Sequence, residues 1–322
     1  MTILGDTFNI IVFVSFVGSI FSVLALLVRK VLHIALPLWF GVCGIALFLF
    51  PFVVPTLWLV SPEETLWING YKVACTVWLV GFITFAFYYI IRSILALHAL
   101  KKYKVCCEEH INQVYIHCQL SIGLKKLPIL YFGTLNEPAC VVTIFRPAII
   151  LNETVIKQLS DKELAIVLCH ELTHIQRKHH VYQRIFDFAS TIHWFNPFVW
   201  ISKNDFAAHC EMDCDQKVLS VMSGKITEIE YATTMLHLME ISSHRRGNKT
   251  NGINALGYLL AKQRMNFILN EPTAVRLRIG IVILVLSIAL TIFLSFYMSR
   301  SYFYPFPAFD TGPEYPTHID TF

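Results

Sequence analysis

Charged residues are scarce in this chain. Asp, Glu, Lys and Arg make up 15% of its 322 residues, hydrophobic residues make up 55%, and the mean hydropathy is +0.56. This balance excludes an ordinary soluble domain and indicates a membrane protein. The formal net charge of +4 comes without a basic helix or an aromatic-basic platform, so direct nucleic-acid binding is not expected.

The chain has no C-x-x-C pair although it holds nine cysteines. Cys106 and Cys107 are adjacent, which suits neither a zinc knuckle nor an ordinary disulfide. A thiolate site built from His209, Cys210 and Cys214 is an alternative, but buried reduced thiols are the simpler expectation. Most of the cysteines lie in the stretch placed below in the cytoplasm, where thiols stay reduced.

Long apolar runs locate four transmembrane helices. The first run has only Asp6 before it and lacks the basic start of a signal peptide, so we interpret it as a retained span. Prolines at 37, 51 and 55 are expected to bend the second run. The predicted spans cover about 8–28, 31–60, 73–97 and 278–299.

Basic residues set the orientation of the spans. Arg29 and Lys30 join the first two spans, a basic group follows the third, and Arg276 and Arg278 precede the fourth. All these positions fall on one side if the chain crosses four times, and that side is the cytoplasm. We therefore expect a multi-pass protein of the cell membrane with both termini outside, a cytoplasmic domain over 98–277 and a short extracytoplasmic tail over 300–322.

The cytoplasmic stretch predicts one α+β domain with its own core. Runs rich in β-branched and aromatic residues predict strands at 129–132, 139–145 and 148–151. The apolar segment 181–201 contains costly polar residues for a span, so it is expected to be a buried or interfacial helix that breaks before Pro197. A further helix is expected over 231–241, and 242–252 is expected to be a flexible polar loop.

His170, Glu171 and His174 form the string H-E-L-T-H. Two histidines four apart lie on one face of a helix and can bind one Zn²⁺, while the glutamate between them points at the open metal position. Ser160–Glu163 has the pattern of a capping box that opens this helix, and its surroundings are apolar on nearly every face. The alternative is a core helix whose histidines are satisfied by hydrogen bonds.

A third zinc ligand is expected because catalytic zinc usually has three protein ligands. Glu211 and Asp215 are i, i+4 neighbours on a predicted helix. Glu211 would bind the metal, and Asp215 would accept the free ring N–H of a ligand histidine, His170 in our interpretation. The alternative is a solvated acidic helix face.

Four features together resemble a known family. They are L-S-x-x-E-L before the histidine motif, the stretch His193–Trp200 after it, the pair Glu211 and Asp215, and the segment Phe145–Leu151. They resemble the BlaR/MecR-type antirepressor membrane zinc metallopeptidases, a gluzincin-like family, over about residues 1–300. The resemblance implies a zinc domain between the third and fourth spans that cleaves a repressor or itself after an outside signal.

One departure from that family concerns the sensor. Its sensors carry a large penicillin-binding domain after the fourth span, whereas only 301–322 follow here, without a Ser-x-x-Lys motif. β-Lactam sensing is therefore not expected, and the inducing signal and substrate stay open. The expected chain is a short member of the family that lacks the sensor domain.

The predicted activity is zinc-dependent endoproteolysis with one Zn²⁺ per chain on His170, His174 and Glu211. The metal would polarise the scissile carbonyl, and Glu171 would take the proton of the water and pass it to the leaving amine. The strand at 139–143 would hold a protein or peptide substrate as an added strand. Tyr231 and His237 stay open as oxyanion donors.

Three other functions are weighed against this one. A housekeeping protease similar to HtpX shares both motifs but places spans between them, and the stretch between them here is too polar for that. A non-enzymatic membrane adaptor would be expected to have lost a key residue, and a transporter or channel would need polar groups inside the spans. Whether the protein forms a homodimer is left open.

Overall fold

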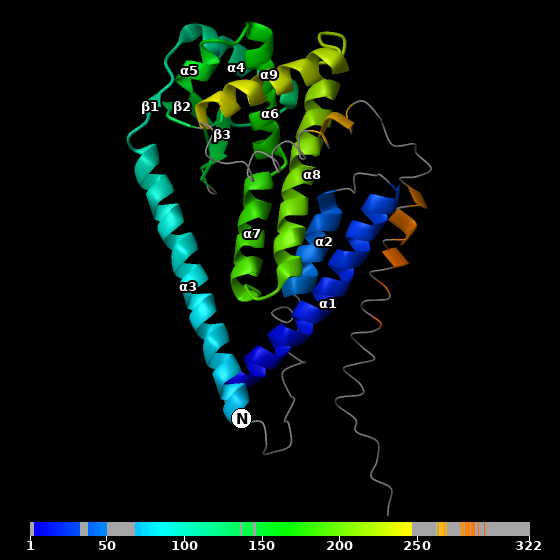
Figure 1. Ribbon diagram of the computed structural model, residues 1–322. Helices are drawn as coiled ribbons and strands as arrows, with labels where there is room; N and C mark the ends of the chain where they lie inside the picture. Colours follow the sequence, from blue (N-terminus) through cyan, green and yellow to red (C-terminus); the bar gives the residue numbers. More distant parts are fainter. Residues whose placement is uncertain are drawn as a thin grey trace, which may run out of the picture.

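The computed structural model describes residues 3–32, 38–49 and 68–246, apart from 136, 144 and 145, and scattered positions between 262 and 293. Residues 33–37 and 50–60 of the predicted second span, most of the predicted fourth span and the tail after residue 299 lie outside the described residues. The described residues form a helical part and an α/β part at opposite ends of the molecule (Figure 1).

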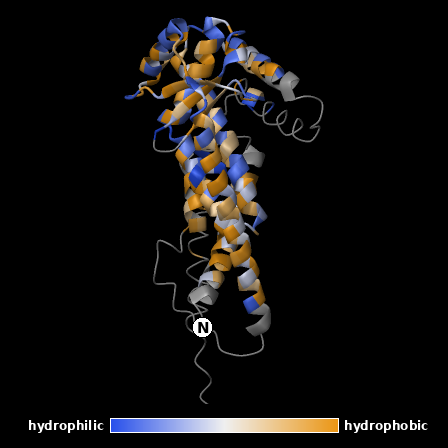
Figure 2. Cartoon of the chain, turned by 90° about the vertical axis from the view of Figure 1, so that its left-hand side faces the viewer, coloured by the Kyte–Doolittle hydropathy of each residue, from blue (hydrophilic) through white to orange (hydrophobic). Residues whose placement is uncertain are grey.

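Three helices form the outer framework of the helical part: α1 (Ile3–Leu32), α2 (Leu38–Leu49) and α3 (Ile68–Leu100). α1 and α3 contain the first and third predicted runs, and α3 leads directly into the α/β part (Figure 1). Among the described residues, one stretch, Lys72–Leu100, is long and apolar enough to cross a membrane, and a shorter apolar helical stretch covers Ile11–Leu27. Figure 2 shows hydrophilic residues gathered around the α/β part.

A four-stranded sheet lies in the α/β part, as the α+β prediction required. Its strands are β1 (Lys104–Val105), β2 (Ile129–Gly133), β3 (Ala139–Val142) and β4 (Ala148–Asn152) in the order β1-β2-β4-β3. β2 and β4 are parallel, and the two outer pairs are antiparallel. Every residue of β4 is buried, so this strand forms the centre of the core.

The three predicted strands are confirmed; β2 and β4 each extend one residue further than predicted, and β3 is shorter. β3 ends at Val142 rather than at Phe145, because Thr143 adopts a left-handed backbone with φ of 66° that extended strands do not contain. As the last strand of the sheet, β3 has one edge without a neighbouring strand among the described residues.

Helices α4 (Glu109–Ile122), α5 (Glu153–Ile156), α6 (Asp161–Gln176) and α9 (Glu228–Arg246) surround the sheet (Figure 1). α4 was not predicted, although its buried residues follow helical spacing: Ile111, Tyr115, Cys118 and Ile122. α9 confirms the predicted helix but continues to Arg246. The first residues of the predicted loop 242–252 are therefore helical, and the rest of it lies outside the described residues.

Helices α7 (His179–Ile192) and α8 (Pro197–Val221) form a long hairpin that runs from the α/β part down between α1, α2 and α3 (Figure 1). The predicted break before Pro197 is confirmed, because Asn196 caps α8 by accepting a 2.9 Å hydrogen bond from the amide of Phe198. Much of the segment 181–201, predicted to be buried or interfacial, is buried and packs within the helical bundle, whereas Phe188, Phe195 and Ile201 are exposed.

Polar side chains fix the tip of this hairpin against all three outer helices. His193 lies 2.8 Å from the hydroxyl of Ser15 in α1 and 2.9 Å from the carbonyl of Phe48 in α2. The indole of Trp78 in α3 donates a 3.0 Å hydrogen bond to the carbonyl of Ile192. These groups are satisfied inside the protein, which lets a polar hairpin lie in an apolar bundle.

Candidate metal centre

Helix α6 carries the histidine motif at the junction of the two parts. Its start is a capping box, as predicted: Ser160 Oγ accepts from the Glu163 amide, and the Glu163 carboxylate accepts from the Ser160 amide at 2.9 Å. The apolar residues of α6 pack into the main core, so the helix is held on several faces. The motif side chains are therefore presented from a rigid support.

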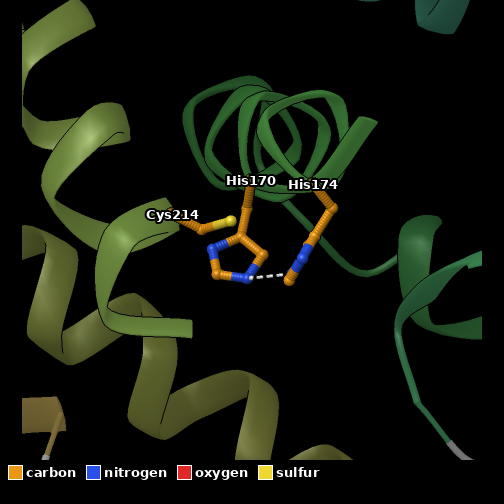
Figure 3. Close-up of side chains that lie close together, drawn as sticks. All are labelled: His170, His174 and Cys214. Atoms are coloured by element: carbon orange, nitrogen blue, oxygen red, sulfur yellow. Dashed lines mark hydrogen bonds between the residues drawn. The ribbon is translucent and has the colours of Figure 1, made fainter. Parts of the chain in front are cut away.

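Three predicted ligand residues meet at one point between α6 and α8. His170 Nε2 lies 3.2 Å from His174 Nε2 and 3.2 Å from Glu211 Oε2, and His174 Nε2 lies 3.5 Å from Glu211 Oε1. Figure 3 shows the two imidazoles side by side beneath α6. Two histidines and a carboxylate thus turn their donor atoms toward a common centre.

The spacing of these donor atoms fits a zinc ion. Zn–N and Zn–O bonds of 2.0–2.2 Å in a tetrahedral arrangement separate the ligand atoms by roughly 3.4 Å. The two Nε2 atoms lie 3.2 Å apart, and each lies 3.2 or 3.5 Å from its nearer carboxylate oxygen of Glu211, Oε2 for His170 and Oε1 for His174, which is close to that value. The donor set of two imidazoles and one carboxylate is also a known catalytic zinc set that leaves a position open.

Cys214 offers an alternative third ligand. Single donor atoms of His170, His174 and Cys214 lie within 4.8 Å of one another, and Figure 3 shows the Cys214 sulfur beside the His170 ring. Burial raises the pKa of this thiol well above its ordinary value, whereas zinc binds the thiolate. The pKa of the Glu211 carboxyl lies below its ordinary value, and its oxygens lie 3.2 and 3.5 Å from the two Nε2 atoms, so we favour the carboxylate.

Asp215 lies behind His170 in a buried polar network. Its side chain is fully buried, and Oδ1 lies 3.4 Å from His170 Nδ1. The hydroxyl of Tyr231 donates a 2.6 Å hydrogen bond to the same oxygen, and the guanidinium of Arg264 donates to both carboxylate oxygens at 2.8 and 2.6 Å. Arg264 Nη1 also lies 3.2 Å from Glu211 Oε2.

The electrostatics of the site favour a bound cation. Burial opposes charge on both histidines, yet hydrogen bonds to Asp215 and Glu211 outweigh it at His170 and raise its pKa to about 9. Burial dominates at His174 and lowers its pKa to about 3, which leaves a free lone pair for a metal. Despite its burial, Glu211 has a lowered pKa because of the histidines and Arg264.

Glu171 lies in a different environment from Glu211 and Asp215 of α8. Burial raises its pKa to about 7, His170 and Arg264 act to lower it, and the charges of Glu211 and Glu137 act to raise it. A carboxylate with a pKa near neutrality is suited to accept and release a proton at ordinary pH. Its charge also acts on Cys140 of β3, and α6 packs against that strand.

Neither open oxyanion candidate points at the meeting point of the ligands. Tyr231 is engaged with Asp215, and His237 Nδ1 lies 3.0 Å from Glu163 at the start of α6. Arg264 was not predicted as a site residue. It stands in a mixed stretch beside Lys262 and Gln263, and nothing in the sequence pairs it with α8.

The BlaR1 peptidase M56 family model matches residues 61–268 of this chain, which is well over half of it. The chain therefore belongs to this family, and the resemblance found in the sequence is confirmed. The match includes both metal-site motifs and most of the α/β part. It supports a peptidase-type protein with a membrane location.

The chain is similar to several curated proteins. It is 25% identical over 199 residues to the methicillin resistance mecR1 protein of Staphylococcus aureus, covering 60% of this chain and 32% of that protein. It is also 25% identical over 174 residues to the regulatory protein BlaR1 of Bacillus licheniformis, covering 54% and 29%. The chain thus spans about a third of the length of these relatives.

Proposed function

We propose that this protein is an integral-membrane zinc endopeptidase with a regulatory role. It would cross the membrane four times and face the cytoplasm with the site between α6 and α8. The observation that carries the proposal is the convergence of His170, His174 and Glu211 next to Glu171, in a chain of a peptidase family.

The residues of the chain have separate tasks in this proposal. His170, His174 and Glu211 hold the metal, and bound zinc supplies a Lewis acid that polarises the scissile carbonyl and acidifies a water. Glu171 takes the proton of that water and delivers it to the leaving amine, which its pKa of about 7 permits. Asp215 accepts the Nδ1 proton of His170 and keeps Nε2 free for the metal.

The substrate would be a protein segment in extended form. β3 is the last strand of the sheet and packs against α6, and Cys140 on it lies within electrostatic reach of Glu171. A segment added to the edge of β3 would therefore run past the catalytic carboxylate. By analogy with the regulatory names of the relatives, we propose a transcriptional repressor or a second copy of this chain as the substrate.

The test uses purified full-length protein in detergent. Wild type is expected to hold one zinc ion, and His174→Ala and Glu211→Ala are expected to lose it, whereas Cys214→Ala keeps it. Glu171→Gln should retain zinc and lose proteolysis of itself or of a casein-type probe. Full zinc content in both ligand variants would overturn the metal assignment, and equal proteolysis by Glu171→Gln would overturn its catalytic role.

A further inference from the structure

A second chain of buried polar groups leads away from His174. Its Nδ1 lies 3.0 Å from Nδ1 of His179, the first residue of α7. The polypeptide turns between α6 and α7 at Lys178, whose backbone is left-handed with φ of 57°, and this turn brings His179 back to the motif helix. On its other side His179 Nε2 lies 3.5 Å from Asp213 Oδ2 on α8.

Two of these atoms, His179 Nε2 and Asp213 Oδ2, are buried without a hydrogen-bond partner. His179 as a whole is fully buried. Asp213 Oδ2 has an ion-pair contact at 3.3 Å with Arg177 Nε. Buried polar atoms without hydrogen bonds are costly and call for an explanation, and here the two atoms face each other.

If His174 binds metal through Nε2, the positions of the ring protons on His174 and His179 account for both buried atoms. A metal-bound neutral imidazole carries its proton on Nδ1, so His174 becomes a donor toward His179. His179 must then accept at Nδ1 and carry its own proton on Nε2. That proton points at Asp213 Oδ2, and a small approach of the two side chains completes the second hydrogen bond.

We propose that His179 and Asp213 are positioning residues that fix the ring orientation and tautomer of His174 for metal binding. The inference rests on the proposed function, because the proton order follows from metal on His174. Each ligand histidine then has its own acceptor, Asp215 for His170 and His179 with Asp213 for His174. α8 supplies Asp215 and Asp213, the acidic ends of the two hydrogen-bonded series, as well as the ligand Glu211.

The Cys214 thiol competes with His174 for Nδ1 of His179. The Cys214 thiol lies 3.5 Å from His179 Nδ1, farther than His174 Nδ1 at 3.0 Å. If the thiol were the donor, His174 would lose its Nδ1 hydrogen bond with His179 and the arrangement would not support the metal. Removal of the thiol therefore separates the two arrangements.

Zinc affinity of the full-length protein, measured by chelator competition, tests the proposal. His179→Leu should bind zinc about 10- to 100-fold more weakly, as expected when the partner of a ligand histidine is lost. His179→Asn should recover most of this loss, because its side-chain oxygen can accept from His174. Cys214→Ala should leave the affinity unchanged, and Cys210→Ala serves as a matched control for a lost buried thiol on α8.

Asp213 is tested in a double-variant cycle. Asp213→Leu should weaken zinc binding when His179 is present and add nothing in the His179→Leu chain. Metal-free unfolding is measured on each variant, so that a general loss of packing is distinguished from a specific loss of metal affinity.

The possible failures are distinguishable. If wild type holds no zinc, the proposed function falls and this inference with it. If wild type holds zinc and His179→Leu binds it equally well, the proposed function stands and the inference is wrong. If His179→Leu and His179→Asn lose the same affinity, or the effects of Asp213→Leu and His179→Leu simply add, the hydrogen-bonded chain is also wrong.

Discussion

Replacement of Asp215 by asparagine probes the network that supports the metal centre. The carboxylate is fully buried and receives two hydrogen bonds from Arg264 and one from Tyr231. An amide of the same shape removes the negative charge and turns an N–H group toward the guanidinium. Removing one partner of a buried ion pair costs about 3–5 kcal/mol. Since Arg264 keeps Glu211 at 3.2 Å, we expect the lower end, about 3 kcal/mol.

The same substitution should weaken zinc binding by about 10- to 100-fold, because His170 loses the charged acceptor of its Nδ1 proton. The fold should survive, since a domain is typically stable by about 5–15 kcal/mol. Both effects are measurable on the full-length protein in detergent: chemical unfolding with a chelator present gives the stability, and chelator competition gives the affinity.

A double variant separates charge from packing. Asp215→Asn combined with Arg264→Gln removes the buried guanidinium that has lost its Asp215 partner, so the metal-free protein should regain about 1–2 kcal/mol over Asp215→Asn alone. Its zinc affinity should stay low. A double variant no more stable than the single one, or an unchanged zinc affinity in Asp215→Asn, would refute the reasoning.

The network also has an expected pH dependence. Burial alone would raise the pKa of Asp215, but Arg264 and the hydrogen bond with His170 outweigh it and hold the pKa at about 2, below the ordinary 3.8. A carboxyl with a lowered folded-state pKa stabilises the protein above its unfolded pKa and loses that contribution as the pH falls. The stability difference between wild type and Asp215→Asn should therefore shrink between about pH 4 and pH 2.

Three further outcomes are expected. Gly81→Ala should destabilise the contact between α3 and the hairpin by about 1–3 kcal/mol in thermal unfolding, because its Cβ would overlap the Trp194 indole, whereas the exposed Ser93→Ala should have little effect. Ser160→Ala should lower the unfolding free energy by about 1 kcal/mol through loss of the α6 cap, and no change would show that the cap is dispensable. Self-cleavage, if it occurs, should fall within 247–252, because 242–246 is helical. Mass spectrometry of the fragments should show the cut in wild type and not in Glu171→Gln. Equal cutting in both proteins would indicate a contaminating protease.

Local sequence patterns determined much of this protein. Residue spacing placed His170 and His174 on one helix face, and the Ser160 and Glu163 pattern fixed where that helix starts. Alternation and β-branched residues located three strands, and Pro197 marked the hairpin turn. These features depend on neighbours a few residues apart, so the sequence is sufficient to reveal them.

Only the tertiary structure decided which distant groups meet. Arg264 reaches Asp215, and His179 stands between His174 and Asp213, through contacts that no local periodicity encodes. The sequence indicates that the polar residues of 181–201 are costly in lipid, and only the tertiary structure supplies the partners on α1, α2 and α3. Burial makes such pairing necessary, but which partner satisfies a buried group depends on packing of the whole chain.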